Sequence, residues 1–136
     1  YLAVTGVFSL LPILFSFTVF TWVAGFDIMY ALQDEEFDKS EKLFSIPSQL
    51  GISNALKLSI VVHFITAVLI VSIGFYSNFH ISYWIGAAIF IGLLIYQHLI
   101  VKPNDLSRIN LAFGTTNGIA SLVFALFTIL SIYYSK

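Results

Sequence analysis

The chain has 136 residues, of which 59% are hydrophobic and only 10% are charged, whereas soluble domains contain about 25% charged residues. A formal net charge of −1 gives no support for nucleic-acid binding, and the absence of cysteine excludes disulfides and zinc–thiolate sites. The composition therefore indicates an integral membrane protein in contact with the lipid bilayer.

Four apolar segments are each long enough to cross the roughly 30 Å hydrocarbon core of a bilayer, which takes about 20 helical residues. They cover about residues 2–26, 56–75, 83–101 and 111–134. We therefore expect an all-α fold, a multi-pass transmembrane helical bundle with four membrane spans. Pro12 lies in the first segment, where a proline is expected to kink the helix. Because the chain begins at Tyr1, inside an apolar segment without a preceding basic region, we expect a piece of a longer protein rather than a signal peptide.

Acidic residues follow the first span at helical spacing. If residues 27–42 form one α-helix, then Asp27, Asp34 and Asp38 project along one narrow stripe, with Tyr30 beside it. Like charges at this spacing repel each other, so we expect a cation to compensate. Carboxylate oxygens suit Mg²⁺, which leaves coordination positions open for a phosphate or diphosphate. A solvated loop that only signals topology would explain the same charges.

The loops between the spans differ in charge. Residues 27–57 and 102–110 hold five of the six Lys and Arg residues, loop 76–82 holds none, and Lys136 lies at the chain end. Positive charge collects in short cytoplasmic loops, so the acidic stripe is expected on the cytoplasmic face. Within the first loop, apolar residues predict a short segment on the membrane surface: Leu43, Phe44, Ile46, Leu50 and Ile52.

Small residues and histidines inside the spans are expected mainly to support packing between helices. Ala88 with Gly92, and Gly114 with Gly118, have the spacing of helix–helix contacts. His63 is expected to form a hydrogen bond between helices, although an ionisable residue in a span is also a candidate for function. His98 is expected at the interface or facing the same cavity. The dispersed histidines, which also include exposed-loop His80, disfavour zinc.

The sequence Asp27-x-x-Tyr30-Ala31-x-x-Asp34-x-x-x-Asp38 resembles the second aspartate-rich motif of the UbiA superfamily of intramembrane prenyltransferases, in the branch of the 4-hydroxybenzoate polyprenyltransferases. Weaker similarities follow in Ser45-Ile46-Pro47, Tyr96-Gln97 and Ala112-Phe113-x-x-x-Asn117. The resemblance implies a nine-helix fold, of which residues 1–136 would be the C-terminal half. The family's first motif, N-D-x-x-D-x-x-x-D, does not occur in this sequence, so a missing N-terminal half is expected to supply it.

The resemblance also implies a reaction and site residues. A UbiA-type enzyme would transfer a polyprenyl group from polyprenyl diphosphate to an aromatic acceptor, 4-hydroxybenzoate or a related phenol or naphthoate, in ubiquinone or menaquinone biosynthesis at the bacterial inner (plasma) membrane. Asp34 and Asp38 are expected to bind Mg²⁺. Asp27 and Tyr30 are expected at the catalytic centre. Basic residues for the diphosphate are expected at two positions, Lys39 and Lys42. Without its N-terminal half the chain is expected to be inactive.

Two alternatives explain the acidic stripe without catalysis. A cation transporter module would use the stripe as a vestibule, but ion pathways need polar groups deep in the spans, and the sequence offers only His63 and a few Ser and Thr there. A non-enzymatic membrane subunit would use the stripe as a docking surface. That alternative requires the reading frame to begin near Tyr1.

Overall fold

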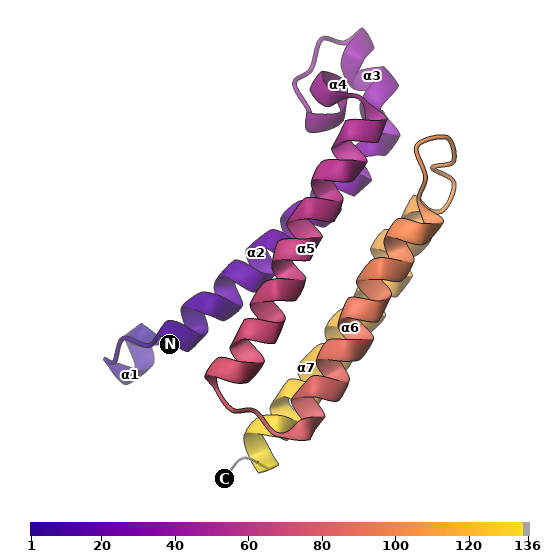
Figure 1. Ribbon diagram of the computed structural model, residues 1–136. Coiled ribbons are helices and arrows are strands. Elements are labelled where there is room, and N and C mark those ends of the chain that lie inside the picture. Colours follow the sequence, from indigo (N-terminus) through magenta and orange to yellow (C-terminus); the bar gives the residue numbers. More distant parts are fainter. Residues whose placement is uncertain (135–136) are drawn as a thin grey trace.

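The computed structural model describes residues 1–134, which form helices joined by loops and contain no β-strand. The elements in chain order are α1 Leu2–Thr5, α2 Leu10–Tyr30, η1 Ala31–Asp34, α3 Glu35–Ser40, α4 Ile46–Leu50, α5 Ile52–Tyr76, α6 Ile81–Ile100, η2 Leu111–Thr116 and α7 Asn117–Tyr134 (Figure 1). The described chain contains 4 helical stretches long and apolar enough to span a membrane: Leu10–Ser40, Ile52–Tyr76, Ile81–Ile100 and Leu111–Tyr134. The predicted all-α membrane bundle is confirmed.

The first span begins later than the sequence suggested. Gly6 ends α1 in a left-handed conformation with φ 66°, and Ser9 is extended before α2 begins at Leu10. Pro12 therefore lies in the first turn of α2, where backbone N–H groups have no partner within the helix and a proline costs little. The predicted kink at Pro12 is wrong, because the chain bends before the proline instead.

The acidic segment is helical but not one α-helix. The turn η1, Ala31–Asp34, is a 3₁₀-helix between α2 and α3. Since a 3₁₀-helix has three residues per turn instead of 3.6, this turn rotates Asp34 and Asp38 by roughly 60° about the axis relative to Asp27. The narrow stripe expected from a continuous α-helix is therefore wrong in this detail, and the three carboxylates fan out over a wider arc.

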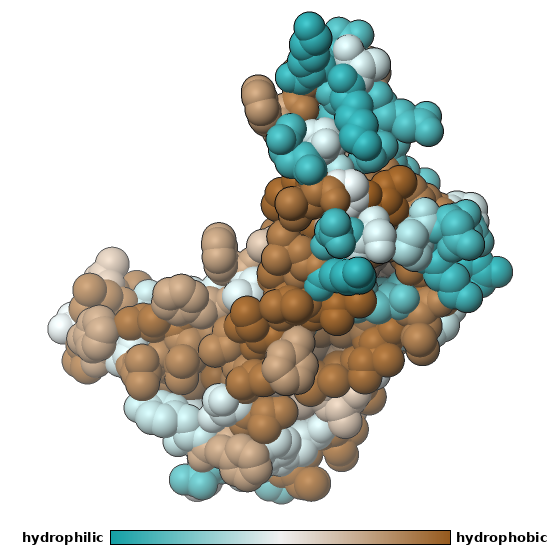
Figure 2. All heavy atoms as spheres, turned by 45° about the horizontal axis from the view of Figure 1, so that its top comes forward, coloured by the Kyte–Doolittle hydropathy of each residue, from teal (hydrophilic) through white to brown (hydrophobic). Residues whose placement is uncertain are grey.

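The four spans form two helical hairpins. Helix α2 packs mainly along α5, α6 packs mainly along α7, and α5 meets α6 over a smaller area (Figure 1). The two charged loops lie at the same end of the bundle, and the α5–α6 loop lies at the other (Figure 1). Figure 2 shows hydrophilic residues gathered over that charged end and hydrophobic residues over the helices. Lys136, expected on the opposite side, lies outside the described residues.

Three glycines allow close packing between the helices. A Cβ at Gly25 would collide with the His63 ring, a Cβ at Gly74 with Trp84 and Tyr83, and a Cβ at Gly86 with Phe127. The small residues predicted for this role are different ones. Gly92, Gly114 and Gly118 have open space where a Cβ would stand, and Ala88 is exposed. The predicted contacts of those pairs are therefore not made within residues 1–134.

Candidate functional site

The predicted acidic residues lie at the charged end of the first hairpin. Asp27 is exposed in the last turn of α2, Asp34 is exposed at the end of η1, and Asp38 is half-buried in α3. None of the three pairs with a Lys or Arg side chain within residues 1–134. Tyr30, the last residue of α2, is 42% exposed. The carboxylates therefore present uncompensated negative charge next to the apolar spans.

These carboxylates fit one kind of metal site and not another. Among the described residues, no three His, Asp or Glu side chains lie close enough together to hold a metal ion by themselves. A closed protein cage is therefore not formed by this part of the chain. Mg²⁺, in contrast, is bound through one or two carboxylates together with waters and substrate phosphates. Exposed Asp27 and Asp34, with half-buried Asp38, have the donor chemistry that such a partly hydrated ion requires.

The two lysines predicted to contact diphosphate differ in their surroundings. Lys39 Nζ lies 2.5 Å from Glu35 Oε1, within one helical turn, and the Glu35 residue is 7% exposed. Lys42 adopts a left-handed backbone with φ 55° directly after α3. The Leu43 N–H then donates to the Asp38 carbonyl at 2.8 Å and closes the turn. Lys39 is thus held by an acid outside the motif, whereas Lys42 is exposed and has no such partner among the described residues.

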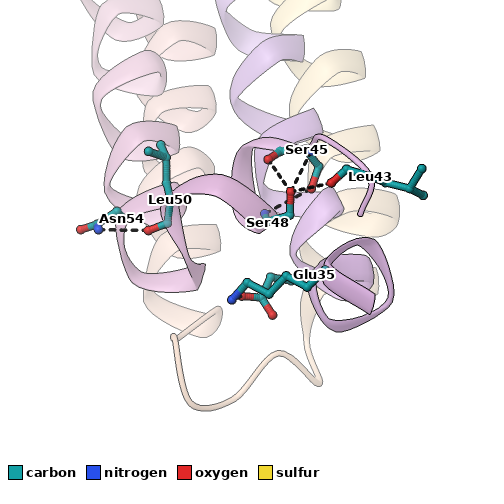
Figure 3. A network of polar contacts seen from close by, with 7 residues as sticks. Glu35, Leu43, Ser45, Ser48, Leu50 and Asn54 are labelled. Atoms are coloured by element: carbon teal, nitrogen blue, oxygen red, sulfur yellow. Dashed lines mark hydrogen bonds and ion pairs between the residues drawn. The ribbon is translucent and has the colours of Figure 1, made fainter. Parts of the chain in front are cut away.

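A short helix folds back beneath the acidic segment. In α4, the Ser45 hydroxyl accepts from the Ser48 N–H at 3.2 Å, and the Ser48 hydroxyl accepts from the Ser45 N–H at 2.9 Å (Figure 3). This capping box, with buried Pro47 in the first turn, starts the helix. Phe44, just before it, is 91% exposed. The sequence had predicted a short segment here, and the structure forms it as a capped helix.

An apolar groove on α2 leads to Asp27. One hollow of about 320 Å³ is lined by Val19, Phe20, Val23, Ala24 and Asp27. A second, of about 280 Å³, shares Ala24 and Asp27 with it and continues toward Ile46 of α4. The shared residues make the two hollows neighbours along one face of the helix. The groove therefore offers a hydrocarbon surface with a single carboxylate beside it.

Aromatic side chains connect the motif tyrosine to the interior. The Tyr30 ring lies 4.5 Å from Phe113 of η2, centroid to centroid, and Phe113 lies 6.3 Å from Phe26. Gln97 of α6, buried, donates its amide to the Ala112 carbonyl at 3.2 Å, next to Phe113. The structure thus brings Tyr30 together with two of the three weaker pieces of the sequence resemblance, those that contain Gln97 and Phe113.

A pair of histidines, buried His63 and half-buried His98, was missed by sequence reasoning. His63 Nδ1 lies 2.8 Å from His98 Nε2, and His63 Nε2 lies 3.1 Å from the Trp22 carbonyl oxygen. His63 was expected to bond a neighbouring helix, which is confirmed. The partnership with His98 was not predicted, because 35 residues separate the two and no local spacing marks them. The Phe26 ring contacts the His63 ring at a tilt of 55°, with centroids 4.7 Å apart, which joins the pair to the aromatic path.

Comparison with known proteins gives the family. The chain matches the UbiA prenyltransferase family over residues 1–132. It is 27% identical over 104 residues to a 4-hydroxybenzoate octaprenyltransferase of Nitrosospira multiformis, covering 76% of this chain and 36% of that protein. It is 30% identical over 86 residues to a protein of the same name from Pseudoalteromonas translucida, covering 60% of this chain and 27% of that protein. The chain thus spans about a third of the length of these curated relatives, and no solved structure matches it. With its family match extending over all four spans, the chain belongs to the UbiA prenyltransferase family.

Proposed function

We propose that this protein takes part in the transfer of a polyprenyl group from polyprenyl diphosphate to an aromatic acceptor, 4-hydroxybenzoate or a related compound, in quinone biosynthesis. The observation that carries the proposal is the apolar groove along α2 with the Asp27 carboxylate beside it. A ligand with a long hydrocarbon tail and an anionic head matches that surface if a cation stands between the head and the carboxylates. The relatives' name, 4-hydroxybenzoate octaprenyltransferase, supports the same reaction class.

The chain's residues take distinct roles in this proposal. Asp34 and Asp38 supply carboxylate oxygens to Mg²⁺, with Asp27 supporting the site from the end of α2. Bound Mg²⁺ stabilises the negative charge that develops on the departing diphosphate. Lys42, exposed beside α3, adds positive charge for the diphosphate, as does Lys39 if it exchanges Glu35 for the substrate.

The apolar side chains protect the reacting carbon. As the carbon–oxygen bond to diphosphate breaks, an allylic cation or a species close to it develops and must be kept from water. A ring carbon of the acceptor forms the new carbon–carbon bond, the ring loses a proton, and diphosphate leaves. Tyr30 and Phe113, whose rings contact each other, form an aromatic surface on which a flat acceptor ring can lie.

The complete enzyme needs more than this chain. We propose that a second acidic motif, contributed by an N-terminal half, faces the carboxylates described above across one diphosphate. We place the site on the cytoplasmic face of a bacterial inner membrane, because the loops that carry five of the six Lys and Arg residues lie at the acidic end. Residues 1–136 on their own are expected to show no transfer.

Replacement of Asp34 tests the proposal in the complete enzyme. Asp34→Ala is expected to lower prenyl transfer by at least about a hundredfold, since an electrostatic contact to the developing charge is lost. Asp105→Ala, which removes another exposed carboxylate at the same end of the bundle, serves as the matched control and should retain activity. Transfer is measured with radiolabelled prenyl diphosphate, with membrane insertion checked in parallel. Full activity in Asp34→Ala would remove Asp34 from the site.

The transporter and docking alternatives make different predictions. A transporter would move cations across vesicles without consuming prenyl diphosphate. A docking subunit would bind another membrane protein and would have no transfer activity in its complete form. A complete protein that inserts correctly yet transfers no prenyl group at any Mg²⁺ concentration would therefore refute the proposed reaction.

A further inference from the structure

A seam of polar contacts joins α2 to α5 inside the bundle. The Ser59 hydroxyl donates to the Gly25 carbonyl at 2.7 Å, and the Thr66 hydroxyl donates to Thr21 Oγ1 at 2.8 Å. His63 lies between these residues on α5 and reaches the Trp22 carbonyl. Ser59, His63 and Thr66 follow one face of the helix at intervals of four and three residues. These contacts, which we call the seam, therefore fix the position of the end of α2 along the axis of α5.

The hydrogen bonds assign the protons of the histidine pair. A carbonyl oxygen can only accept, so neutral His63 carries its proton on Nε2 and donates it to Trp22. His63 Nδ1 is then an acceptor, and the proton in the 2.8 Å contact belongs to His98 Nε2. His98 thus donates from α6, in the second hairpin, to the seam in the first. The other ring nitrogen of His98 is buried without a partner in the described part of the chain.

The pair stands directly behind the acidic end of α2. The His63 ring occupies the space where Gly25 lacks a side chain and contacts the Phe26 ring. Asp27 directly follows Gly25 and Phe26 in the chain. Phe26 also contacts Phe113, against which Tyr30 packs. A turn of the His63 ring would therefore push on the backbone and the aromatic path that carry Asp27 and Tyr30. The Nε2 proton of His98 is the contact that holds this ring from the second hairpin.

We propose that His98 is a positioning residue for prenyl transfer: by donating to His63 it holds the end of α2, and with it Asp27 and Tyr30, in register with the second hairpin. This inference rests on the proposed function. It goes beyond that function because neither histidine belongs to the aspartate motif. Displacement of reacting groups by about 1 Å can lower a rate by about a hundredfold, so loss of the contact should appear in kcat.

The test compares two amides at position 98 in the complete enzyme. His98→Gln places an amide nitrogen near the position of Nε2 and keeps a donor for His63, whereas His98→Asn is too short to reach it. We expect His98→Asn to lower kcat by about tenfold or more, with the KM for prenyl diphosphate changed less than about twofold, and His98→Gln to restore kcat to within about threefold. Nitrogen-15 NMR of labelled histidine should show that His63 Nδ1 loses its hydrogen bond only in His98→Asn.

Tyr83→Phe is the matched control for a purely structural effect. The Tyr83 hydroxyl donates to the Ile70 carbonyl at 2.7 Å and also joins α6 to α5, but at the end of the bundle remote from the aspartates. Tyr83→Phe should lower thermal stability and leave kcat unchanged. If His98→Asn behaves like Tyr83→Phe, or if the Gln and Asn variants have the same kcat, the positioning role is refuted while the proposed function stands. A wild-type enzyme that fails to transfer a prenyl group would instead refute the proposed function.

Discussion

Gly25→Ala is the substitution whose cost follows most directly from the packing. The added Cβ would collide with three atoms of the His63 ring, Cδ2, Nε2 and Cε1. The ring has little freedom to retreat, because both nitrogens are hydrogen-bonded, to Trp22 and to His98, and the Phe26 ring packs against it. Either the core accepts the strain, which costs about 1–3 kcal/mol, or the ring turns and gives up two bonds of about 0.5–1.5 kcal/mol each.

Gly92→Ala is the matched control for this variant. Alanine is favoured over glycine in a helix by about 1 kcal/mol, and this gain applies at both positions, since each glycine lies inside a long helix. At Gly92 the new Cβ meets nothing within 4 Å. The difference between the two variants therefore isolates the collision, and we expect Gly25→Ala to be less stable than Gly92→Ala by about 1–3 kcal/mol.

Unfolding in detergent, followed by tryptophan fluorescence, gives the two free energies. The double variant Gly25→Ala/His63→Ala supplies a further check, because the Cβ no longer collides once the ring is removed. In that background the cost of Gly25→Ala should vanish and only the helical gain should remain. Equal stabilities of Gly25→Ala and Gly92→Ala, or a Gly25→Ala cost that persists without the ring, would show that the close contact of α2 with α5 has been misjudged.

Further substitutions address other parts of the chain. Pro12→Ala should change the free energy of unfolding by less than about 0.5 kcal/mol. Replacing a proline in a helix interior would instead raise that free energy by about 3 kcal/mol. Ser45→Ala removes the cap of α4 and should cost about 1 kcal/mol, seen as roughly fivefold faster hydrogen exchange of the Ser48 amide. The Ser107 hydroxyl and N–H hold the pKa of Asp105 below its usual value. Ser107→Ala removes the hydroxyl and keeps the N–H, so it should raise that pKa in an NMR titration and remove the hydroxyl's share of the stability that is lost as pH falls through the folded-state pKa; an unchanged titration would contradict the hydroxyl contact.

The membrane architecture was predictable because it depends on local properties. Length and apolar composition identified all four spans, and the charge difference between loops correctly placed the two charged loops at one end. The position of Pro12 was misjudged because α2 begins within an apolar run, where composition does not change at the helix start. The ends of the other predicted spans differ from the helix ends in the structure by a few residues for the same reason, since apolar residues continue across the helix ends.

The interior of the candidate site was only partly predictable, because it depends on contacts between distant residues. The spacing of the acidic residues assumed ideal α-helix, and the 3₁₀ turn at Ala31–Asp34 changed their directions. The close-packing glycines were misassigned, because Gly25 is recognised only once the His63 ring is seen against it. Two neutral histidines in different spans carry no spacing signal at all. The motif resemblance found Tyr30, but not the Phe113 ring that packs on it.

The division of the bundle into two hairpins has a consequence for biogenesis. Within the first, Ser59 and Thr66 of α5 reach oxygens of α2, and within the second Gln97 reaches the Ala112 carbonyl. The Ser59 and Thr66 hydroxyls and the Gln97 amide nitrogen thus find partners within their own hairpins, which matters because an unsatisfied group in hydrocarbon costs several kcal/mol. The contacts between α2 and α5 therefore favour their pairing in lipid as soon as both have left the translocon, and the second pair can dock afterwards through the His63–His98 and Tyr83–Ile70 contacts.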